Sequence, residues 1–433
     1  MQDNQALTHA SSLGTVFALF AVPANFEDLT PIRQHSLVES LKSLNADLPE
    51  GLGILGSLKA LASFAKSQGM SKVVATRAHD TNGMLEQAEM AELLYGEGIA
   101  LELVGSNYAV EPGTVRKDDG TPLKVYTPFY KRWMQIGWAR PFVLDVKGTS
   151  WGKPQGLGVY PTPSGPAPFQ IRAGEAFALR TFARFAKRSL SEYNELRNRP
   201  DLSGTSHLSH ALAHGEIHPR TLLVQLGDTA GHETFRKEIA WREFYADVMF
   251  HNPHTLDDYF NSDYAAMLYS DPDVDAEKLK AWEEGRTGYP IVDAAMRQLK
   301  QTGWMHNRSR MIVASFLVKD LHFEWQVGAR HFEKWLTDFD PASNSHGWQW
   351  TAGCGTDASP YYRVFNPTLQ GEKFDPNGDY VRKFVPELKH ISGAGIHQPW
   401  LLVDGLAQGY PAPIVDHFVE RDESLARLKA LKN

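Results

Sequence analysis

Cysteine is almost missing from this 433-residue sequence, because Cys354 is the only one. An internal disulfide is therefore excluded, and a reducing compartment is expected. Long apolar runs are also missing: the early stretch Thr15–Val22 has eight residues, whereas a membrane helix needs about twenty. No basic leader followed by an apolar segment opens the sequence. These features predict a cytoplasmic protein without a membrane partner.

An excess of positive charge is missing as well, because the formal net charge is −7. Residues 1–126 contain nine Lys and Arg against fifteen Asp and Glu, whereas the rest of the chain contains 35 against 36 and is nearly neutral. Nucleic-acid binding needs a local basic patch and not a basic chain. The composition therefore neither supports nor excludes such binding.

Tryptophan does not occur before Trp133, although the chain has eleven. This first part alternates between strand-like and helix-like segments, which indicates a parallel sheet covered by helices. The expected strands are Val16–Val22, Lys72–Thr76 and Ile99–Val104, and the expected helices are Ser57–Ser67 and Leu85–Tyr95.

A segment rich in Gly, Pro and Ser follows at 148–168 and is typical of a connection between domains. From about Gly174 the spacing of apolar residues becomes helical. The expected helices are Glu175–Leu190, Thr234–Phe250, Pro290–Thr302, Asn307–Leu321 and Ala329–Leu336. The sequence therefore predicts an α/β domain over 1–126, a linker over 127–173 and a large helical domain over 174–433.

Two sharp-looking signals are weak. Gly51–Gly56 spells G-x-G-x-x-G, but the preceding residues make a poor strand and no acid lies between Gly56 and Asp80, so a glycine-rich turn is favoured over a dinucleotide site. A second signal is a group of four histidines, the first three of which have helical spacing. No matching cysteine motif accompanies them, so ordinary hydrogen-bonded histidines are favoured over a metal site. The four are His207, His210, His214 and His218. For Cys354, a structural thiol is favoured over a nucleophile.

Three segments carry more information. Hydroxyl residues at 204–209 precede a helical run, where they fit either plain capping or phosphate binding. On the helix expected at 234–250, Glu238, Trp241 and Arg242 share one face; an amphipathic helix with a salt bridge is the simpler interpretation. In the third segment, 288–375, tryptophans alternate with Arg, Asn, Asp and His, as a flat ligand with polar edges requires.

Together these segments resemble the photolyase/cryptochrome family, and most of all its class I cyclobutane pyrimidine dimer photolyases. The likeness is dense from Gly174 to Leu388, with runs such as TGYPIVDAAMRQL, GWMHNR and ASFLVKDL. It implies a doubly wound α/β domain followed by a large helical domain that binds a folded FAD. It also implies a possible second antenna chromophore, a folate or a deazaflavin.

The resemblance implies roles for individual residues around the cofactor. Arg310 would pair with Asp338 near the isoalloxazine ring, and Asn344 would face flavin N5, where plant cryptochromes have Asp and insect ones Cys. The remaining cofactor positions would be Tyr193, Thr205, Ser206, Leu208, Ser209, Trp304, Asn307 and Asp340.

The resemblance also implies that damaged DNA binds beside the flavin, with the dimer flipped out of the helix. Trp241 and Trp350 would form apolar walls, and Met311 replaces the histidine of (6-4) photolyases. The implied substrate-binding residues are Glu238, Trp241, Arg242, Asn307, Arg308, Met311 and Trp350. The expected partner is DNA that contains pyrimidine dimers, bound with weak sequence preference by a monomer.

The implied reaction is light-driven electron transfer from reduced FAD to the dimer, which needs no metal and no nucleophile. Glu238, Asn344, Trp348 and Trp325 are the implied catalytic residues, the two tryptophans as the first members of a chain that photoreduces oxidised flavin. The third tryptophan of that chain has no counterpart; Tyr269 and Trp282 are the alternatives.

A further departure lies at the N-terminus, where a strand resembling WFRRDLR is missing before Asp3. If so, a central strand is absent, its neighbours have unpaired edges, and antenna binding is in doubt. The competing functional hypotheses are a cryptochrome-like photoreceptor that signals through a partner and a non-catalytic DNA-binding helical protein. Asn344 and Met311 favour repair.

Overall fold

The computed structural model describes residues 1–154, 159–167, 171–357 and 362–431. The chain forms two compact units, each discontinuous in sequence. Unit 1 comprises Met1–Arg188 and Ser206–Pro253, and unit 2 comprises Ser189–Thr205 and His254–Asn433.

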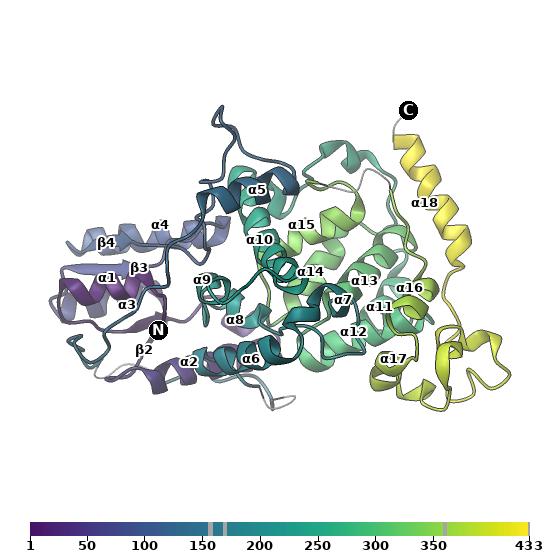
Figure 1. The fold of residues 1–433 in the computed structure, drawn as a ribbon, viewed down its shortest axis with the longest axis horizontal. Coiled ribbons are helices and arrows are strands. Elements are labelled where there is room, and N and C mark those ends of the chain that lie inside the picture. The colour runs from purple at the N-terminus through teal and green to yellow at the C-terminus, as the bar shows by residue number, and fades with distance from the viewer. Residues whose placement is uncertain (155–158, 168–170, 358–361, 432–433) are drawn as a thin grey trace. The chain divides into compact units, whose positions relative to one another are not determined.

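Unit 1 combines short parallel strands with helices (Figure 1). Its strands are β1 (Leu19–Ala21), β2 (Gly53–Leu55), β3 (Lys72–Ala75) and β4 (Ala100–Leu103). Its helices are α1 (Gln5–Leu13), α2 (Pro31–Asp47), α3 (Leu58–Ser67), α4 (Thr81–Gly96), α5 (Tyr126–Ile136), α6 (Glu175–Arg188), α8 (Ser209–Ala213), α9 (Pro219–Leu223) and α10 (Ala230–His251), with a 3-10 turn at Phe26–Asp28.

The described strands form two parallel pairs and not one continuous sheet. β1 pairs with β2, and β3 pairs with β4; the registers place Leu19 opposite Gly53 and Lys72 opposite Ala100. Both pairs pack against one hydrophobic core that includes Phe64 of α3 and Leu94 of α4. Within the described residues each strand therefore has one edge without a strand partner.

The segment Gly51–Gly56 corrects one expectation. Gly53–Leu55 form the buried strand β2, so this segment is not merely a glycine-rich turn. Only Gly51 has a positive φ, of 80°. Because Gly51 precedes the strand, Gly53 begins it and Gly56 follows it, the motif spans a strand and does not form a phosphate loop after one.

The histidine group is also different from its expected form. His207 has a φ of 52° and lies before α8, so the first three histidines are not on one helix. His210 lies 3.5 Å from the Glu216 carboxylate, and His218 accepts a hydrogen bond from the Arg220 backbone N–H at 3.2 Å. These contacts are of the kind expected for ordinary hydrogen-bonded histidines. The described residues contain no group of three or more acidic, His or Cys side chains that could hold a metal ion.

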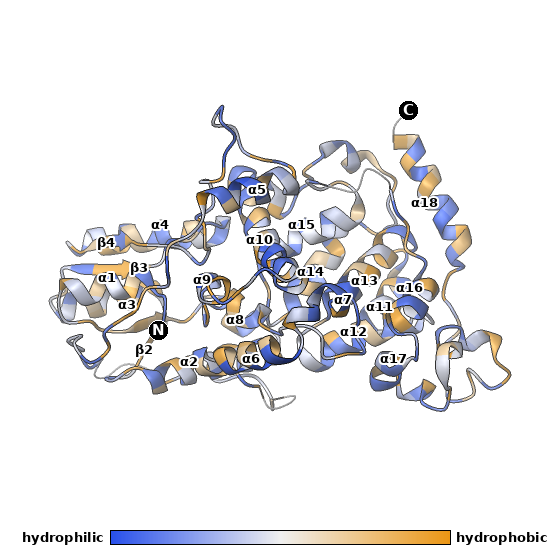
Figure 2. Ribbon diagram, in the orientation of Figure 1, coloured by the Kyte–Doolittle hydropathy of each residue, from blue (hydrophilic) through white to orange (hydrophobic). Residues whose placement is uncertain are grey.

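Helix α6 begins and ends close to its expected bounds and has two distinct faces. Ala178, Phe182 and Phe185 are buried, whereas Arg180 and Arg184 are exposed. Figure 2 shows the corresponding hydrophobic and hydrophilic colours along the helix. This amphipathic spacing is the reason that the sequence predicts α6 well.

Unit 2 is helical in its described residues. Its helices are α7 (Tyr193–Leu196), α11 (Ala276–Glu284), α12 (Pro290–Thr302), α13 (Asn307–Lys319), α14 (Trp325–Trp335), α15 (Pro341–Ala352), α16 (Pro367–Phe374), α17 (Asp379–Phe384) and α18 (His417–Leu431). Five 3-10 turns lie at Leu190–Glu192, Ser262–Ala266, Pro386–Leu388, Gly393–His397 and Pro399–Leu401, and another, Pro253–Leu256, begins in unit 1.

Helix α12 matches its expected range, because its ends are marked in the sequence. Pro290 occupies the first helical turn and Gly303 follows the last residue with a φ of 63°. Proline loses no helical hydrogen bond at that position, and glycine adopts the left-handed conformation without a steric penalty. No helix in the described part of either unit is long and apolar enough to cross a membrane.

A buried carboxyl group of α10 predicts a dependence of stability on pH. Asp247 is 1% exposed and accepts a hydrogen bond from the Gly113 backbone N–H at 2.7 Å. Burial raises the pKa of Asp247 to about 6. The folded state therefore binds this proton more tightly than the unfolded chain, and the stability from this residue is lost as pH rises from about 4 to 6.

We expect the stability of Asp247→Asn relative to the parent protein to rise by about 1.4 kcal/mol between pH 5 and pH 8. Asparagine keeps an acceptor for Gly113 and does not titrate. Urea unfolding at both pH values measures the difference, and parallel pH dependences of the two proteins would contradict it.

Candidate active site

An ion pair between α13 and the segment before α15 is the centre of the candidate site in unit 2. The Arg310 guanidinium lies 2.7 Å from Oδ2 of Asp338, and its Nε donates to the Met305 carbonyl at 2.9 Å. The Asp338 side chain is 1% exposed. The expected Arg310–Asp338 pair is therefore present, and its carboxylate is held in a desolvated position where an unpaired charge would be costly.

Asn344 lies on the first turns of α15, which Asp340 caps by accepting the Ser343 backbone N–H at 2.7 Å. The Asn344 Nδ2 donates to the Ala329 carbonyl at 3.1 Å. This bond fixes the side-chain amide, so its Oδ1 keeps one direction as an acceptor.

Several buried polar atoms in the described part of unit 2 have no hydrogen-bond partner, and three of them belong to expected site residues. These three are Oδ1 of Asp338, Oδ1 of Asn344 and Nε1 of Trp348. Such atoms are rare in folded proteins, since each costs about 1–3 kcal/mol. Two acceptors and one donor suit a ligand with polar edges, so the residues present fit a flavin.

The start of α13 carries several expected site residues. Asn307 is its first residue and is exposed, while Trp304 and Met311 are partly buried. The Arg308 guanidinium binds Oδ1 of Asn198 at 2.8 and 3.2 Å. Asn198 thus positions Arg308, a role that the sequence analysis missed.

The expected phosphate-side residues are divided between the two units. Tyr193 is the buried first residue of α7 in unit 2, which also contains Thr205. Ser206, Leu208 and Ser209 belong to unit 1, where Leu208 is 1% exposed and Ser209 begins α8.

Helix α10 of unit 1 carries the expected lesion-side residues Glu238, Trp241 and Arg242. The Trp241 ring stacks on Tyr126 of α5, with centroids 3.7 Å apart and planes 5° apart. Arg242 donates to the Asn107 carbonyl at 3.0 Å and the Leu212 carbonyl at 3.3 Å. Both side chains are thus held in defined positions by neighbours within unit 1.

The opposite side of α10 is fixed by a buried carboxylate, Glu243, which is 1% exposed. It accepts hydrogen bonds from the backbone N–H groups of Ala109 and Val110, at 2.5 and 3.1 Å, and from Trp133 Nε1 at 2.6 Å. Burial raises the pKa of Glu243, and the three donors oppose that rise. No motif in the sequence indicates this anchor.

Aromatic rings line α14 and α15 in unit 2. Trp348 and Trp325 are both buried, at 2% and 1% exposure, whereas Trp350 is partly exposed. Trp348 packs against Phe332, with centroids 4.9 Å apart, and against Gly328, where an added Cβ would lie 2.1 Å from the ring. Gly328 and Trp325 are three residues apart and therefore lie on the same side of α14. Trp348 thus packs against the side of α14 that carries Trp325.

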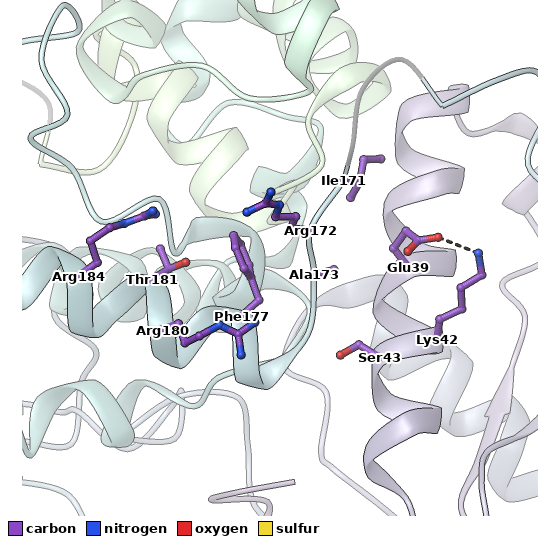
Figure 3. Close-up of a pocket in the computed structure, with 10 residues that line it drawn as sticks. All are labelled: Glu39, Lys42, Ser43, Ile171, Arg172, Ala173, Phe177, Arg180, Thr181 and Arg184. Carbon is purple, nitrogen blue, oxygen red and sulfur yellow. Dashed lines mark hydrogen bonds and ion pairs between the residues drawn. The ribbon is translucent and has the colours of Figure 1, made fainter.

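A separate cavity of about 720 Å³ lies within unit 1 (Figure 3). Its walls are side chains of α2 and α6 and of the segment that leads into α6. They are Glu39, Lys42, Ser43, Ile171, Arg172, Ala173, Phe177, Arg180, Thr181 and Arg184. Four cationic side chains therefore surround the space with one carboxylate, and that carboxylate already binds Lys42 at 2.8 Å. No pattern in the sequence indicates this cavity.

The fold and these side chains define a flavoprotein with a helical cofactor-binding part. Comparison with known proteins agrees: a family model of DNA photolyase matches residues 1–143, and a model of the FAD binding domain of DNA photolyase matches residues 235–430. The deoxyribodipyrimidine photo-lyase of Vibrio cholerae is 38% identical, with 99% of this chain and 97% of that protein covered.

Two solved structures have the same fold. The class III photolyase from Agrobacterium tumefaciens matches with a TM-score of 0.88 and 34% sequence identity. The match covers 100% of this chain and 95% of the Agrobacterium chain. The archaeal photolyase from Sulfolobus tokodaii, which contains two FAD molecules, has a TM-score of 0.84 and 25% identity, with 99% and 97% covered. The chain belongs to the DNA photolyase family.

Proposed function

We propose that this protein repairs cyclobutane pyrimidine dimers in DNA with light, as a deoxyribodipyrimidine photo-lyase. The observation that carries the proposal is the buried Arg310–Asp338 pair, together with the partnerless buried Oδ1 atoms of Asp338 and Asn344. When bound, reduced FAD supplies the chemistry: one light-driven electron passes to the dimer and returns after the cyclobutane ring opens.

The protein's own residues bind and orient the cofactor in this proposal. Arg310 and Asp338 would hold the ring system, and the buried Oδ1 of Asn344 would be available as an acceptor for a ring N–H. The other proposed cofactor ligands are Tyr193, Thr205, Ser206, Leu208, Ser209, Trp304, Asn307 and Asp340. Residues 174–433 form the proposed catalytic domain, with 1–126 and 127–173 as the antenna-type domain and the linker.

DNA binding is assigned to residues that recognise an extruded dinucleotide. Trp241 and Trp350 offer aromatic faces to the flipped bases, and Glu238 offers hydrogen bonds to the pyrimidine edge. Arg242, Asn307, Arg308 and Met311 complete the proposed set. Because shape and stacking dominate, we propose weak sequence preference, and a monomer that acts in the cytoplasm.

Asn344 and Met311 favour repair over photoreceptor signalling. The Asn344 amide is fixed by Ala329 and carries a neutral acceptor, where an aspartate would place a charge beside the ring. Met311 adds no proton donor at the lesion, in keeping with a cyclobutane dimer as substrate.

The deciding experiment is repair of a dimer-containing oligonucleotide by the FAD-loaded protein, in blue light and in darkness. Loss of dimers in light alone is the expected result. Light-dependent flavin chemistry without loss of dimers would favour the photoreceptor, and folded protein that refuses added FAD would overturn both.

We further propose that the unit 1 cavity holds the second, antenna chromophore. A volume of about 720 Å³ suits a ligand of drug size. Lys42, Arg172, Arg180 and Arg184 match the carboxylates of a folate or the anionic groups of a deazaflavin, and Phe177 offers an aromatic face (Figure 3). The second FAD in the Sulfolobus tokodaii photolyase is a precedent for a further chromophore in a protein of this fold.

Reversing two charges tests this site. We expect Arg180→Glu with Arg184→Glu to weaken binding of added methenyltetrahydrofolate or deazaflavin at least tenfold, and to leave FAD content unchanged. Arg188→Glu changes an exposed arginine of the same helix that does not line the cavity, and is the matched control. Equal chromophore binding by all three proteins, measured by absorption titration, would contradict the assignment.

A further inference from the structure

We infer that Tyr259 is the electron donor that follows Trp325 in flavin photoreduction, and that Glu324 accepts its phenolic proton. This inference rests on the proposed function, because Trp348 and Trp325 are its first two donors. The sequence left the third donor open between Tyr269 and Trp282. The contacts within unit 2 point to neither.

The ring of Tyr259 contacts the ring of Trp325. Their rings are edge to face, with centroids 6.2 Å apart, although 66 positions separate them in sequence. Both are buried, Tyr259 at 4% and Trp325 at 1% exposure. This direct contact of the two rings gives an electron a short path from Tyr259 to Trp325.

The position of the phenol decides what happens after the electron leaves. A tyrosine that loses an electron becomes a very strong acid, so its oxidation is favourable only where a base takes the proton. The Tyr259 hydroxyl donates a hydrogen bond to Oε1 of Glu324 at 2.9 Å. A carboxylate is an effective base for this purpose, and the bond already sets the path of the proton.

The step balances with the groups present. The radical cation of Trp325 gains one electron from Tyr259, and the Tyr259 O–H proton moves to the Glu324 carboxylate. The products are neutral Trp325, a neutral tyrosyl radical and a protonated Glu324. Charge separation in the buried interior disappears, so the return of the electron is slowed. A thiolate in solution can later give one electron to the radical, while the proton returns from Glu324 to the phenolic oxygen; the products are the phenol, the Glu324 carboxylate and a thiyl radical.

Tyr269 is a poorer terminus. Its ring stacks near Tyr259, with centroids 6.4 Å apart, and the two side chains share a hydrogen bond, but the Tyr269 hydroxyl donates to the Tyr264 carbonyl at 3.1 Å and not to a carboxylate. A backbone carbonyl does not accept a proton at neutral pH. Tyr269 can therefore share the radical only if its own proton finds another base.

Trp282 is the other alternative, and it forms a side branch. Its ring lies 6.2 Å from Trp348, but it is 0% exposed and its Nε1 donates to the Val313 carbonyl at 3.1 Å. A cation there would be buried beside the His331 ring, 5.3 Å away, without a carboxylate bonded to the indole. Burial disfavours such a charge, so Trp282 is not the terminus.

Flash photolysis of the protein loaded with oxidised FAD tests the inference, with the radical identified by electron paramagnetic resonance. Ring-deuterated tyrosine in the wild-type protein should narrow the spectrum and so identify a tyrosyl radical. We expect Tyr259→Phe to lose that signal and to lower the yield of long-lived radical at least tenfold. Glu324→Gln, which keeps an acceptor but removes the base, should slow tyrosyl formation at least tenfold.

Tyr269→Phe and Trp282→Phe are matched controls and should keep the wild-type signal. A tyrosyl radical that persists in Tyr259→Phe, or that disappears in either control, overturns the inference. Trp348→Phe separates it from the proposed function: this variant should lose fast flavin reduction altogether. If Trp348→Phe reduces flavin at the wild-type rate, the whole proposed path fails, whatever Tyr259 does.

Discussion

Arg310→Ala is expected to lose bound FAD and to unfold with a free energy about 3–5 kcal/mol lower than the parent protein. The reason is the Asp338 carboxylate, whose side chain is 1% exposed and lies 2.7 Å from the guanidinium. Without Arg310 this charge has no compensating cation in a desolvated position. FAD stoichiometry from the absorption spectrum and urea unfolding give the two values.

Arg297→Ala is the matched control for this experiment. Arg297 forms a comparable ion pair in unit 2, with Glu387 at 2.7 Å, but it is not among the proposed cofactor residues. The Glu387 side chain is 27% exposed, so water can replace part of the lost interaction. We expect a smaller loss of stability and full FAD content. An Arg310→Ala protein that retains FAD and stability would remove the pair from the cofactor site.

Trp241→Ala is expected to weaken binding of dimer-containing DNA about five- to 150-fold, which corresponds to about 1–3 kcal/mol for one stacked base. One face of the indole is covered by Tyr126, so the Tyr126–Trp241 stack supports a base on its remaining face. Undamaged DNA, which stays stacked in its own helix, should bind with almost the same affinity to variant and parent.

Two substitutions complete this test. Trp241→Phe keeps an aromatic face and should recover most of the affinity for damaged DNA. Tyr95→Ala removes an aromatic side chain that is 86% exposed, elsewhere in unit 1, and should change nothing. If Trp241→Ala loses affinity for damaged and undamaged DNA equally, Trp241 contacts the backbone and not a flipped base.

The sequence predicted those parts of the fold that depend on local signals. Helix α12 was found from Pro290 and Gly303, and α6 from its apolar spacing. Helix α2 was not found, because Gln34 and Ser36 are buried among its apolar residues and blur the periodic pattern. Strand β2 was missed because it has only three residues, too few for a recognisable pattern. Its hydrogen bonds come from pairing with β1, which is distant in sequence.

The candidate site likewise has residues that the sequence predicted and contacts that it did not. The Arg310–Asp338 pair followed from a family resemblance, because both residues lie in long matching runs. The contact of Tyr259 with Trp325 and the cavity between α2 and α6 depend on residues brought together by tertiary packing. No local spacing contains that information, so a single sequence does not reveal them.

Glu243 has a consequence for the way damage is recognised. Because this carboxylate binds two backbone amides and an indole on the inner side of α10, the helix has little freedom to rearrange when DNA arrives. The protein then offers a preorganised template and loses little conformational entropy on association. The deformation must come from the duplex, and it is least costly where a lesion has already weakened base stacking. Selectivity would thus arise from the mechanical weakness of damaged DNA as well as from contacts with it.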